Sequence, residues 1–270
     1  MLAEERRQRI LELLAADRRV IAKDLAGRFQ ISIDSIRRDL TIMEEQGLLQ
    51  KTYGGAIPLS PLPKVRTLSQ PRSIRYGEAA PHQDAISRYA ASLIQMNDTV
   101  FIGGAGIHYG MLRHLPEDIP FTVITNALTI AENIRNRSHI ESYLIGGKLR
   151  SAGDSLIDTI AFEMIGKFNY DIGFITGGGI ALNGVSTSTP EGAALTRAVS
   201  EASRRTICLA PHEKIGVQMF AGSVQLHQID LLITDQGASE KFVREIESRN
   251  IQVKIADEYD SNEGANHESD

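Results

Sequence analysis

The chain has 270 residues, more than one average domain, so a small domain joined to a larger one is expected. Hydrophobic residues make up 42%, enough for packed cores, and no apolar run approaches the length of a membrane span. The charged start MLAEERRQR is not typical of a signal peptide, and the single cysteine, Cys208, lies in the apolar run TICLA. We therefore expect a cytoplasmic protein without membrane partners, disulfides or cysteine-based metal sites, and we assign it no metal and no cofactor.

The net charge of −5 conceals an uneven distribution of charged residues. Residues 1–75 hold 14 Lys and Arg against 9 Asp and Glu, a net charge of +5, whereas residues 76–270 hold 15 against 25, a net charge of −10. Because cationic side chains supply the phosphate contacts that dominate nucleic-acid affinity, only the first part is suited to binding DNA. Taken alone, the excess is explained equally well by a solvated surface of mixed charge.

The segment 1–57 has the helix spacing of a helix-turn-helix domain followed by a hairpin. Helices are expected at 4–16 and 21–29, and a short turn leads from the second helix to a third that begins at Ser32, a good N-cap. In this arrangement the second helix crosses the DNA backbone and the third enters the major groove. The sequence therefore predicts a DNA-binding domain.

The third helix, SIDSIRRDL and the residues after it, has one apolar face. Its apolar residues, at spacings of three, four and three, are Ile33, Ile36, Leu40 and Met43. Arg38 points away from this stripe, and Ser35 and Arg37 flank the outward face. In the alternative interpretation, Arg37 and Arg38 only pair with acidic neighbours on the helix, namely Asp34, Glu44 and Glu45.

A wing is expected after the third helix, which Gly47 would end as a C-cap. The run LLQKTYGGAI reads as two short strands around Gly54-Gly55, a pair that tolerates positive φ. Residues near its tip could reach phosphate or the minor groove, although Tyr53 could instead pack the hairpin. The complete set expected to contact DNA is Ser32, Ser35, Arg37, Arg38, Lys51, Thr52 and Tyr53.

The chain resembles the DeoR family of bacterial sugar-metabolism repressors. The blocks ERRQRILELL, IAKDLAGRFQIS, SIDSIRRDL and EEQGLLQKTYGGA follow the order of the family, and the resemblance extends over nearly the whole chain. It implies a winged helix-turn-helix repressor of a carbohydrate-metabolism operon, with Ser35, Arg37 and Arg38 in the family's DNA-contacting role. One departure is Tyr53, where the family usually has a histidine.

Two segments lack apolar periodicity. Residues 58–75 hold four of the nine prolines and are expected to form a semi-rigid linker. The tail 257–270, DEYDSNEGANHESD, is acidic and polar, so disorder is expected there.

The segment 76–256 alternates strand-like with helical apolar runs, which predicts an α/β domain with a mostly parallel sheet covered by helices on both faces. Ligands bind beyond the carboxyl ends of such strands. Four of these ends carry glycines or small polar residues, and their convergence predicts an effector pocket. The expected effector-binding residues in these loops are Gly103, Gly104, Ala105, Gly106, His108, Thr125, Asn126, Gly147, Arg150, Gly177 and Gly178.

The same loops resemble the family's sensor domain, which is similar in fold to ribose-5-phosphate isomerase, and the resemblance adds Glu191 and Lys214 to the site. The phosphate loop departs from the family, because GGAGIH has Gly103 in place of an Asp and Gly106-Ile107 in place of paired threonines. Thr196-Arg197 likewise replaces the usual Lys-Arg. The loss of two hydroxyl donors predicts an atypical effector, such as an unphosphorylated or differently placed sugar derivative.

Three of the expected effector-binding residues have a simpler interpretation, and so does the whole domain. His108 could be a surface histidine, Lys214 a loop charge, and Glu191 a residue that favours a helix N-terminus. An isomerase is the rival function, but the chain lacks a paired-carboxylate loop and Asp171 begins its strand, so no enzyme is expected. A DNA-binding oligomer without an effector is a third possibility. Because one short helix and a wing bind DNA weakly, a homo-oligomer, dimer or tetramer, is expected on operator DNA.

Overall fold

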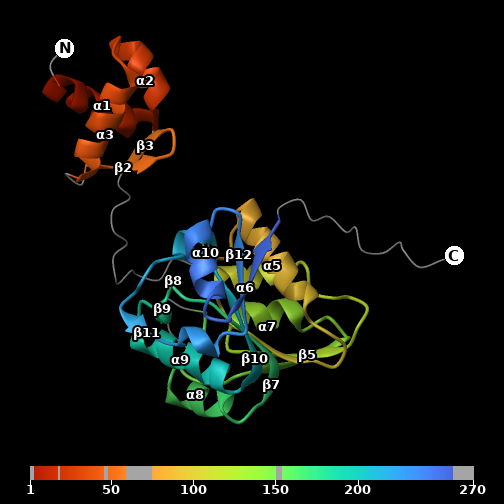
Figure 1. Cartoon of the computed structure of the whole chain (residues 1–270). Helices are drawn as coiled ribbons and strands as arrows, with labels where there is room; N and C mark the ends of the chain where they lie inside the picture. Colours follow the sequence, from red (N-terminus) through yellow and green to blue (C-terminus); the bar gives the residue numbers. More distant parts are fainter. Residues whose placement is uncertain (1–2, 18, 46–47, 59–74, 150–153, 258–270) are drawn as a thin grey trace. The chain divides into compact units, whose positions relative to one another are not determined.

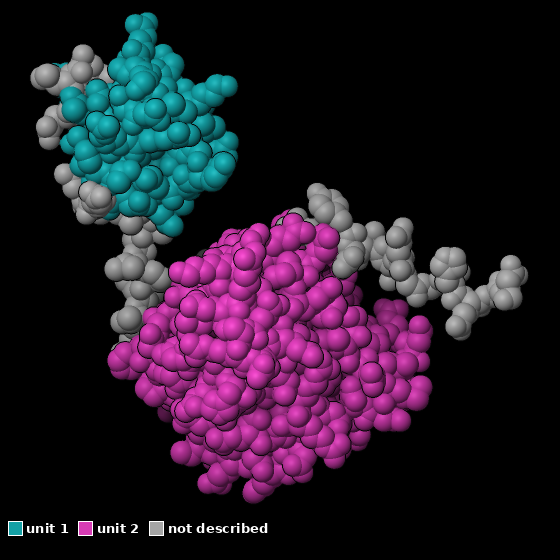
Figure 2. All heavy atoms as spheres, in the orientation of Figure 1, with its two compact units in different colours: residues 1–63 teal, residues 64–270 magenta. Residues whose placement is uncertain are grey.

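The computed structural model describes residues 3–17, 19–45, 48–58, 75–149 and 154–257. The chain divides into two compact units, residues 1–63 and 64–270, which Figure 2 colours separately. Most of the expected linker and tail lies outside the described residues, as do Gly47 and Arg150. Within the described ranges, no helix has both the length and the apolar character needed to cross a bilayer.

The described part of the first unit consists of three helices and a three-stranded antiparallel sheet of order β1-β3-β2 (Figure 1). The elements are α1 (Ala3–Asp17), β1 (Val20–Ile21), α2 (Ala22–Phe29), α3 (Ile33–Glu45), β2 (Leu49–Thr52) and β3 (Gly55–Pro58). The three predicted helices and the hairpin are confirmed. Strand β1 was not predicted, and Ile21, which we expected to begin the second helix, lies in this strand instead.

The predicted apolar stripe of α3 forms the centre of this unit. Ile36 and Met43 are fully buried and Leu40 is almost so, while Ile33 packs at the edge of the same core. Residues of α1, including Ile10, complete the core. The buried stripe therefore orients α3 and leaves its polar face outward.

The hairpin turn differs from the prediction. Thr52 pairs with Gly55, so the two-residue loop is Tyr53-Gly54, and neither glycine has a positive φ. Gly55 is required for another reason: a Cβ there would lie 1.8 Å from the carbonyl oxygen of Val20 in β1. The close approach of two backbones, rather than turn conformation, excludes a side chain at this position.

The second unit is built on a seven-stranded sheet whose strand order is β13-β12-β10-β7-β4-β5-β6 and whose pairs are all parallel. The strands are β4 (Thr99–Ile102), β5 (Phe121–Thr125), β6 (Ile140–Leu144), β7 (Tyr170–Ile175), β10 (Ser203–Leu209), β12 (Leu231–Asp235) and β13 (Gln252–Ala256). The predicted parallel α/β fold is confirmed. A small antiparallel sheet of β8 (Gly179–Ala181), β9 (Gly184–Thr187) and β11 (Ala221–Gly222) was not predicted.

Helices cover both faces of the large sheet (Figure 1). They are α5 (Pro81–Ser92), α6 (Gly106–Met111), α7 (Leu128–Ile134), α8 (Thr159–Ile165), α9 (Pro190–Glu201) and α10 (Glu240–Glu247), with two short 3-10 helices, η1 (His212–Lys214) and η2 (Leu226–Gln228). Successive strand residues enter opposite cores: Val100 and Ile102 pack with α5, α6 and α7, whereas Phe101 packs with α8, α9 and α10. Burial on both faces explains why these strands read as continuous apolar runs.

The strand order places the reversal of the chain at the centre of the sheet. The chain passes from β4 outward to β5 and β6, and then returns to β7 on the other side of β4. The loops after β4 and β7 therefore leave the sheet in opposite directions. Open parallel sheets bind ligands in the crevice that such a switch point creates.

Candidate DNA-binding surface and effector site

The start of α3 is fixed by its own cap. The Ser32 hydroxyl accepts a hydrogen bond from the Ser35 amide at 3.2 Å and lies 2.9 Å from the Ser35 hydroxyl. Ser32 is thus the N-cap that the sequence predicted. Ser32, Arg37 and Arg38 are exposed and Ser35 is half-buried, so these predicted residues share the polar side of one helix.

The two arginines of α3 differ in their surroundings. The Arg37 guanidinium lies 3.5 Å from the Asp34 carboxylate, at the outer limit of a hydrogen bond, and both side chains are largely exposed. The side chain of Arg38 is exposed and makes no ion pair with another described residue. The alternative in which these arginines only pair with acidic neighbours therefore holds weakly for Arg37, and among the described residues Arg38 has no such pair.

A buried carboxylate on α3, which sequence reasoning missed, joins this helix to α1. Asp39 is 3% exposed and accepts hydrogen bonds from Arg6 Nε at 2.6 Å and from Arg7 Nε at 3.1 Å. The spacing held a signal, because Asp39 lies three residues after Ile36 and four before Met43, on the buried face. The two ion pairs hold α3 against α1.

The wing is attached to α3 through Lys51. Its ammonium donates to the Thr41 hydroxyl at 2.8 Å, and its backbone amide donates to the Glu44 carboxylate at 2.8 Å. Lys51 thus connects hairpin and helix, whereas Thr52 and Tyr53 are exposed at the tip. The Tyr53 side chain is fully exposed, so the alternative in which it packs the hairpin is wrong.

The loop after β4 forms the centre of the candidate effector site. His108 is 4% exposed, not the surface histidine of the simpler interpretation, and its Nδ1 lies 3.2 Å from the Gly103 carbonyl oxygen. The pKa of His108 is lowered to about 4, mainly by burial and to a smaller extent by the charge of Lys214, while the Gly103 and Ile175 carbonyls oppose the shift. Nε2 makes no hydrogen bond. The ring is therefore neutral near pH 7 and presents an unpartnered nitrogen.

Lys214 approaches the same place from η1, after β10. Its ammonium lies 3.4 Å from the hydroxyl of Thr176, the residue that follows β7, and that hydroxyl donates to the Leu209 carbonyl at 2.7 Å. Burial lowers the pKa of Lys214, although the nearby Cys208 and Glu213 oppose this shift. The structure thus brings a half-buried cation to the strand ends at the switch point.

Asn126 supplies a second unpartnered polar atom. The residue follows β5 and is fully buried; its Nδ2 donates to the Leu156 carbonyl at 3.0 Å, whereas Oδ1 has no partner. A Cβ at Gly103 would lie 3.7 Å from this oxygen, so Asn126 faces the loop after β4. Thr125, by contrast, accepts the Ala127 amide at 3.1 Å and stabilises the turn.

Tyr76 closes the other side of the loop, and nothing in the sequence pattern indicated it. Its hydroxyl lies 3.0 Å from the Gly104 carbonyl and 2.8 Å from the carboxylate of Asp154, which is fully buried and also accepts hydrogen bonds from Thr129. A Cβ at Gly104 would lie 2.2 Å from the Ser155 hydroxyl. The loop after β4 is therefore tightly enclosed.

The helix after this loop is short. Ala105 precedes α6 without a side-chain cap, and a Cβ at Gly106 would lie 2.4 Å from the Arg75 carbonyl oxygen. Because α6 has 6 residues, it offers little of the helix dipole that the sequence interpretation invoked for anion binding.

Other predicted effector residues face different neighbours. Gly147, at φ +144°, lies against the Asp158 side chain, Gly177 against the backbone of Ser186, and Gly178 against Met219. Glu191 is exposed in the first turn of α9. The structure therefore gathers Gly103, Gly104, His108, Asn126 and Lys214, and Arg150 lies outside the described residues.

Asp171, the carboxylate considered for an isomerase, lies near the amino end of β7. It accepts hydrogen bonds from the Thr99 amide at 2.9 Å and from Arg204 at 3.1 Å. These contacts connect β7 to β4 and β10 at the amino ends of the strands, opposite the loops described above, which agrees with the predicted position of Asp171 at the start of its strand.

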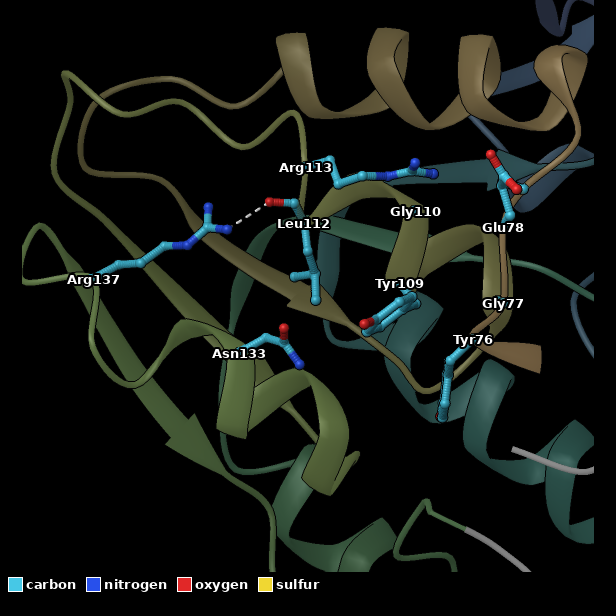
Figure 3. A pocket seen from close by; sticks show the side chains of 11 residues that line it. Tyr76, Gly77, Glu78, Tyr109, Gly110, Leu112, Arg113, Asn133 and Arg137 are labelled. Atoms are coloured by element: carbon cyan, nitrogen blue, oxygen red, sulfur yellow. Dashed lines mark hydrogen bonds between the residues drawn. The ribbon is translucent and has the colours of Figure 1, made fainter. Parts of the chain in front are cut away.

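A cavity of about 360 Å³ that was not predicted lies beside α6 and contains one predicted effector residue, Gly106 (Figure 3). Tyr76 and Tyr109, whose rings are 4.9 Å apart, line it together with the arginines Arg113 and Arg137. Both arginines are engaged, since Arg113 lies 3.0 Å from Asp84 and Arg137 donates to the Leu112 carbonyl at 2.7 Å.

Comparisons with known proteins cover both units. The DeoR-like helix-turn-helix domain matches residues 6–61, and the DeoR C terminal sensor domain matches residues 78–236. The chain is 31% identical to the HTH-type transcriptional repressor GlcR of Bacillus subtilis, over 96% of this chain and 98% of that protein. It is 27% identical to the regulator GolR of Listeria innocua, over 95% and 100%, and 26% identical to the lactose phosphotransferase system repressor of Staphylococcus aureus, over 95% and 100%.

Among solved structures, ribose 5-phosphate isomerase A from Methanocaldococcus jannaschii is similar to part of this chain. The TM-score is 0.37 at 10% identity, and the match covers 49% of this chain and 53% of the isomerase, about half of each. The two matched domains and the near full-length relatives, all transcription regulators, lead to a single assignment. The chain belongs to the DeoR family of DNA-binding transcriptional regulators.

Proposed function

We propose that this regulator represses a carbohydrate-metabolism operon in the cytoplasm: residues 1–57 bind double-stranded operator DNA, and residues 76–256 bind a sugar or sugar-phosphate effector and assemble the chain into a dimer or tetramer. The names of the relatives support the choice of repressor and of carbohydrate, since they include a lactose phosphotransferase system repressor. An effector that binds more tightly to one of two conformations of the regulator, one able and one unable to bind DNA, shifts the equilibrium toward that conformation.

The observation that carries the DNA-binding proposal is the exposed polar face of α3. One side of the helix is fixed by the buried stripe and by Asp39, and the other presents Arg38 without a described partner. Arginine on such a face is suited to paired hydrogen bonds with guanine or to contacts with phosphate. Ser32, Ser35 and Arg37 would contribute from the same face, and Thr52 and Tyr53 from the wing, with Lys51 fixing the wing to the helix.

The test of this surface compares Arg38→Ala with Arg9→Ala. Loss of one DNA contact costs about 1–3 kcal/mol, or about 5-fold to 150-fold in Kd. Arg9 is also largely exposed but pairs with Glu12 on α1, so its removal should leave DNA affinity unchanged. Equal operator affinity of Arg38→Ala and the parent, in an anisotropy titration at fixed salt, would disprove the assignment of α3.

The effector proposal rests on unpartnered polar atoms at the switch point. An unsatisfied buried donor or acceptor costs about 1–3 kcal/mol, which a ligand hydroxyl bound to Asn126 Oδ1 or His108 Nε2 would recover. The adjacent Lys214 ammonium favours an anionic ligand. A sugar derivative with a negative group therefore suits this site, even though the loop after β4 lacks threonine hydroxyls. Gly103 lies beside His108 and Asn126, whereas the space for a side chain at Gly104 is already filled by Ser155, Ala127 and Tyr76.

The effector test is a thermal-melt screen of the full chain with sugars and sugar phosphates. A compound that raises Tm for the parent should have a much smaller effect on Lys214→Gln, because the variant loses the cation at the strand ends. Lys167→Gln removes an exposed lysine after α8 and should respond like the parent. If no compound shifts Tm, the alternative of a DNA-binding oligomer without an effector is favoured.

A further inference from the structure

Titratable side chains from three distant parts of the sequence meet at the carboxyl ends of β10 and β12. His82 lies in the first turn of α5, His212 in η1 after β10, and Asp235 ends β12. One potential ligand atom from each lies within 4.8 Å of those of the other two. Throughout the described residues, this is the one cluster of three or more His, Cys, Asp or Glu side chains with such geometry.

The interatomic distances define a continuous set of potential ligand atoms. His212 Nδ1 lies 2.7 Å from Asp235 Oδ2 and 3.8 Å from Glu213 Oε2, and His82 Nε2 lies 2.9 Å from Glu213 Oε1. The two imidazole rings are 5.0 Å apart between centroids. The Glu213 carboxylate therefore lies near both imidazole rings, and the Asp235 carboxylate is hydrogen-bonded to the His212 ring.

Asp235 and His212 are held in place by hydrogen bonds within the protein. Asp235 is 2% exposed and accepts the backbone amides of His212 at 2.8 Å and Gly237 at 3.0 Å. It also contacts the His212 ring, whose Nδ1 lies 2.7 Å from Asp235 Oδ2. A Cβ at Gly237 would lie 2.5 Å from His212 Nδ1, so the glycine leaves room for the ring. These contacts fix the positions of the Asp235 carboxylate and the His212 imidazole relative to each other.

We propose that His82, His212 and Asp235, completed by Glu213, bind a divalent transition-metal ion. Two imidazoles with carboxylates form a ligand set typical of zinc and related ions, whereas calcium and magnesium prefer oxygen ligands alone. Zinc ligands lie about 2.0–2.2 Å from the ion and therefore about 3.4 Å from one another in a tetrahedral site. The ligand atoms here are up to 4.8 Å apart, so the widest pair must close by about 1.4 Å through rotation of the half-buried His82 side chain. The ion would displace the proton that His212 Nδ1 shares with Asp235.

This site goes beyond the proposed regulator, and it departs from our sequence expectation of no metal. An ion here would connect the first turn of α5 to the loops after β10 and β12. The same 3-10 helix carries Lys214 of the candidate effector site, two residues after His212. The ion would therefore hold in place the segment from which Lys214 reaches the strand ends.

The experiment uses the full chain, without a histidine tag and stripped of metal, and measures Zn²⁺ affinity by competition with a chromophoric chelator. We expect one Zn²⁺ per chain, no competition from equimolar Mg²⁺, and a rise in Tm with Zn²⁺. His82→Gln and His212→Gln should each weaken Zn²⁺ binding by at least about 10-fold. Parent-like Zn²⁺ affinity in both variants would overturn the proposal, and equal competition by Mg²⁺ would overturn the ion class.

The matched control is His227→Gln, an exposed histidine in η2 that should leave Zn²⁺ affinity unchanged. A loss in this control as large as in His82→Gln would mean that scattered histidines bind the ion, and would overturn the site. His212 is hydrogen-bonded to the buried Asp235, so the deciding variant is His82→Gln, on the half-buried first turn of α5, where replacement does not disturb a buried carboxylate. A visible Co²⁺ spectrum that is present in the parent and absent in His82→Gln gives an independent readout.

Discussion

The contrast between two adjacent glycines in the wing gives the sharpest test of the first unit. In Gly55→Ala, the new Cβ would lie 1.8 Å from the Val20 carbonyl oxygen, 2.8 Å from the Val20 carbonyl carbon and 2.9 Å from the Ile21 Cα. All three are backbone atoms, so no side-chain rotation relieves the overlap. A carbon in contact lies about 3.5 Å away, and β1 must therefore move by more than about 1 Å.

That movement breaks the pairing of Val20 with Ala56 and of Ile21 with Gly55, together with the 2.8 Å hydrogen bond from the Ala22 amide to the Gly54 carbonyl. At about 0.5–1.5 kcal/mol for each hydrogen bond and about 1–3 kcal/mol for overpacking, the first unit should lose about 3 kcal/mol. In Gly54→Ala the new Cβ has open space and φ is not positive, so the change should be within about 0.5 kcal/mol.

The assay is amide hydrogen exchange of the full chain, followed on peptides from the first unit. A loss of about 3 kcal/mol corresponds to roughly 100-fold faster exchange in Gly55→Ala, with peptides of the second unit unchanged. Equal exchange in the two variants would refute the claim that β1 requires a glycine opposite it.

Three further predictions address single contacts. Asp39→Ala leaves Arg6 and Arg7 without their shared acceptor and should destabilise the first unit by about 2–3 kcal/mol, seen as faster exchange in α1, whereas unchanged exchange would contradict the ion-pair role. The pKa of His108 is about 4 in the folded protein and 6.5 in the unfolded chain, so the free energy of unfolding is highest above pH 6.5 and falls by about 3 kcal/mol as the pH drops toward 4. In chemical denaturation, His108→Leu should lack this pH dependence. Tyr76→Phe removes the hydroxyl that joins Gly104 to Asp154 and should lower the free energy of unfolding by about 1 kcal/mol. It should also weaken the binding of any effector found in the melt screen; an unchanged Tm shift with that effector would show that Tyr76 is not part of the site.

Periodicity made the larger elements predictable. The stripe from Ile33 to Met43 fixed both the position and the outward face of α3, since one helical face had to be buried. The strands of the second unit were recognisable because burial on both faces makes them short apolar runs. Strand β1 escaped detection because two residues show no period, and its partner, Gly55, is identified only by the space between two backbones.

The sites were less predictable than the fold, because they depend on contacts between distant segments. His108 looked like a surface residue since a histidine beside glycines carries no pattern of its own, and only the packed loop shows that it is buried. Tyr76 fell next to the expected linker, 78 residues from Asp154, its hydrogen-bond partner. The proposed metal ligands His82 and Asp235 are farther apart in the sequence than Tyr76 and Asp154 are.

The most direct test of the central proposal is a fluorescence-anisotropy titration of the full chain on DNA from upstream of its own and neighbouring genes, at two salt concentrations and with a panel of sugars and sugar phosphates. We expect specific, salt-sensitive binding that Arg38→Ala weakens and that one compound of the panel reverses. Absence of specific binding by the folded protein, or binding that neither Arg38→Ala nor any compound alters, would contradict it.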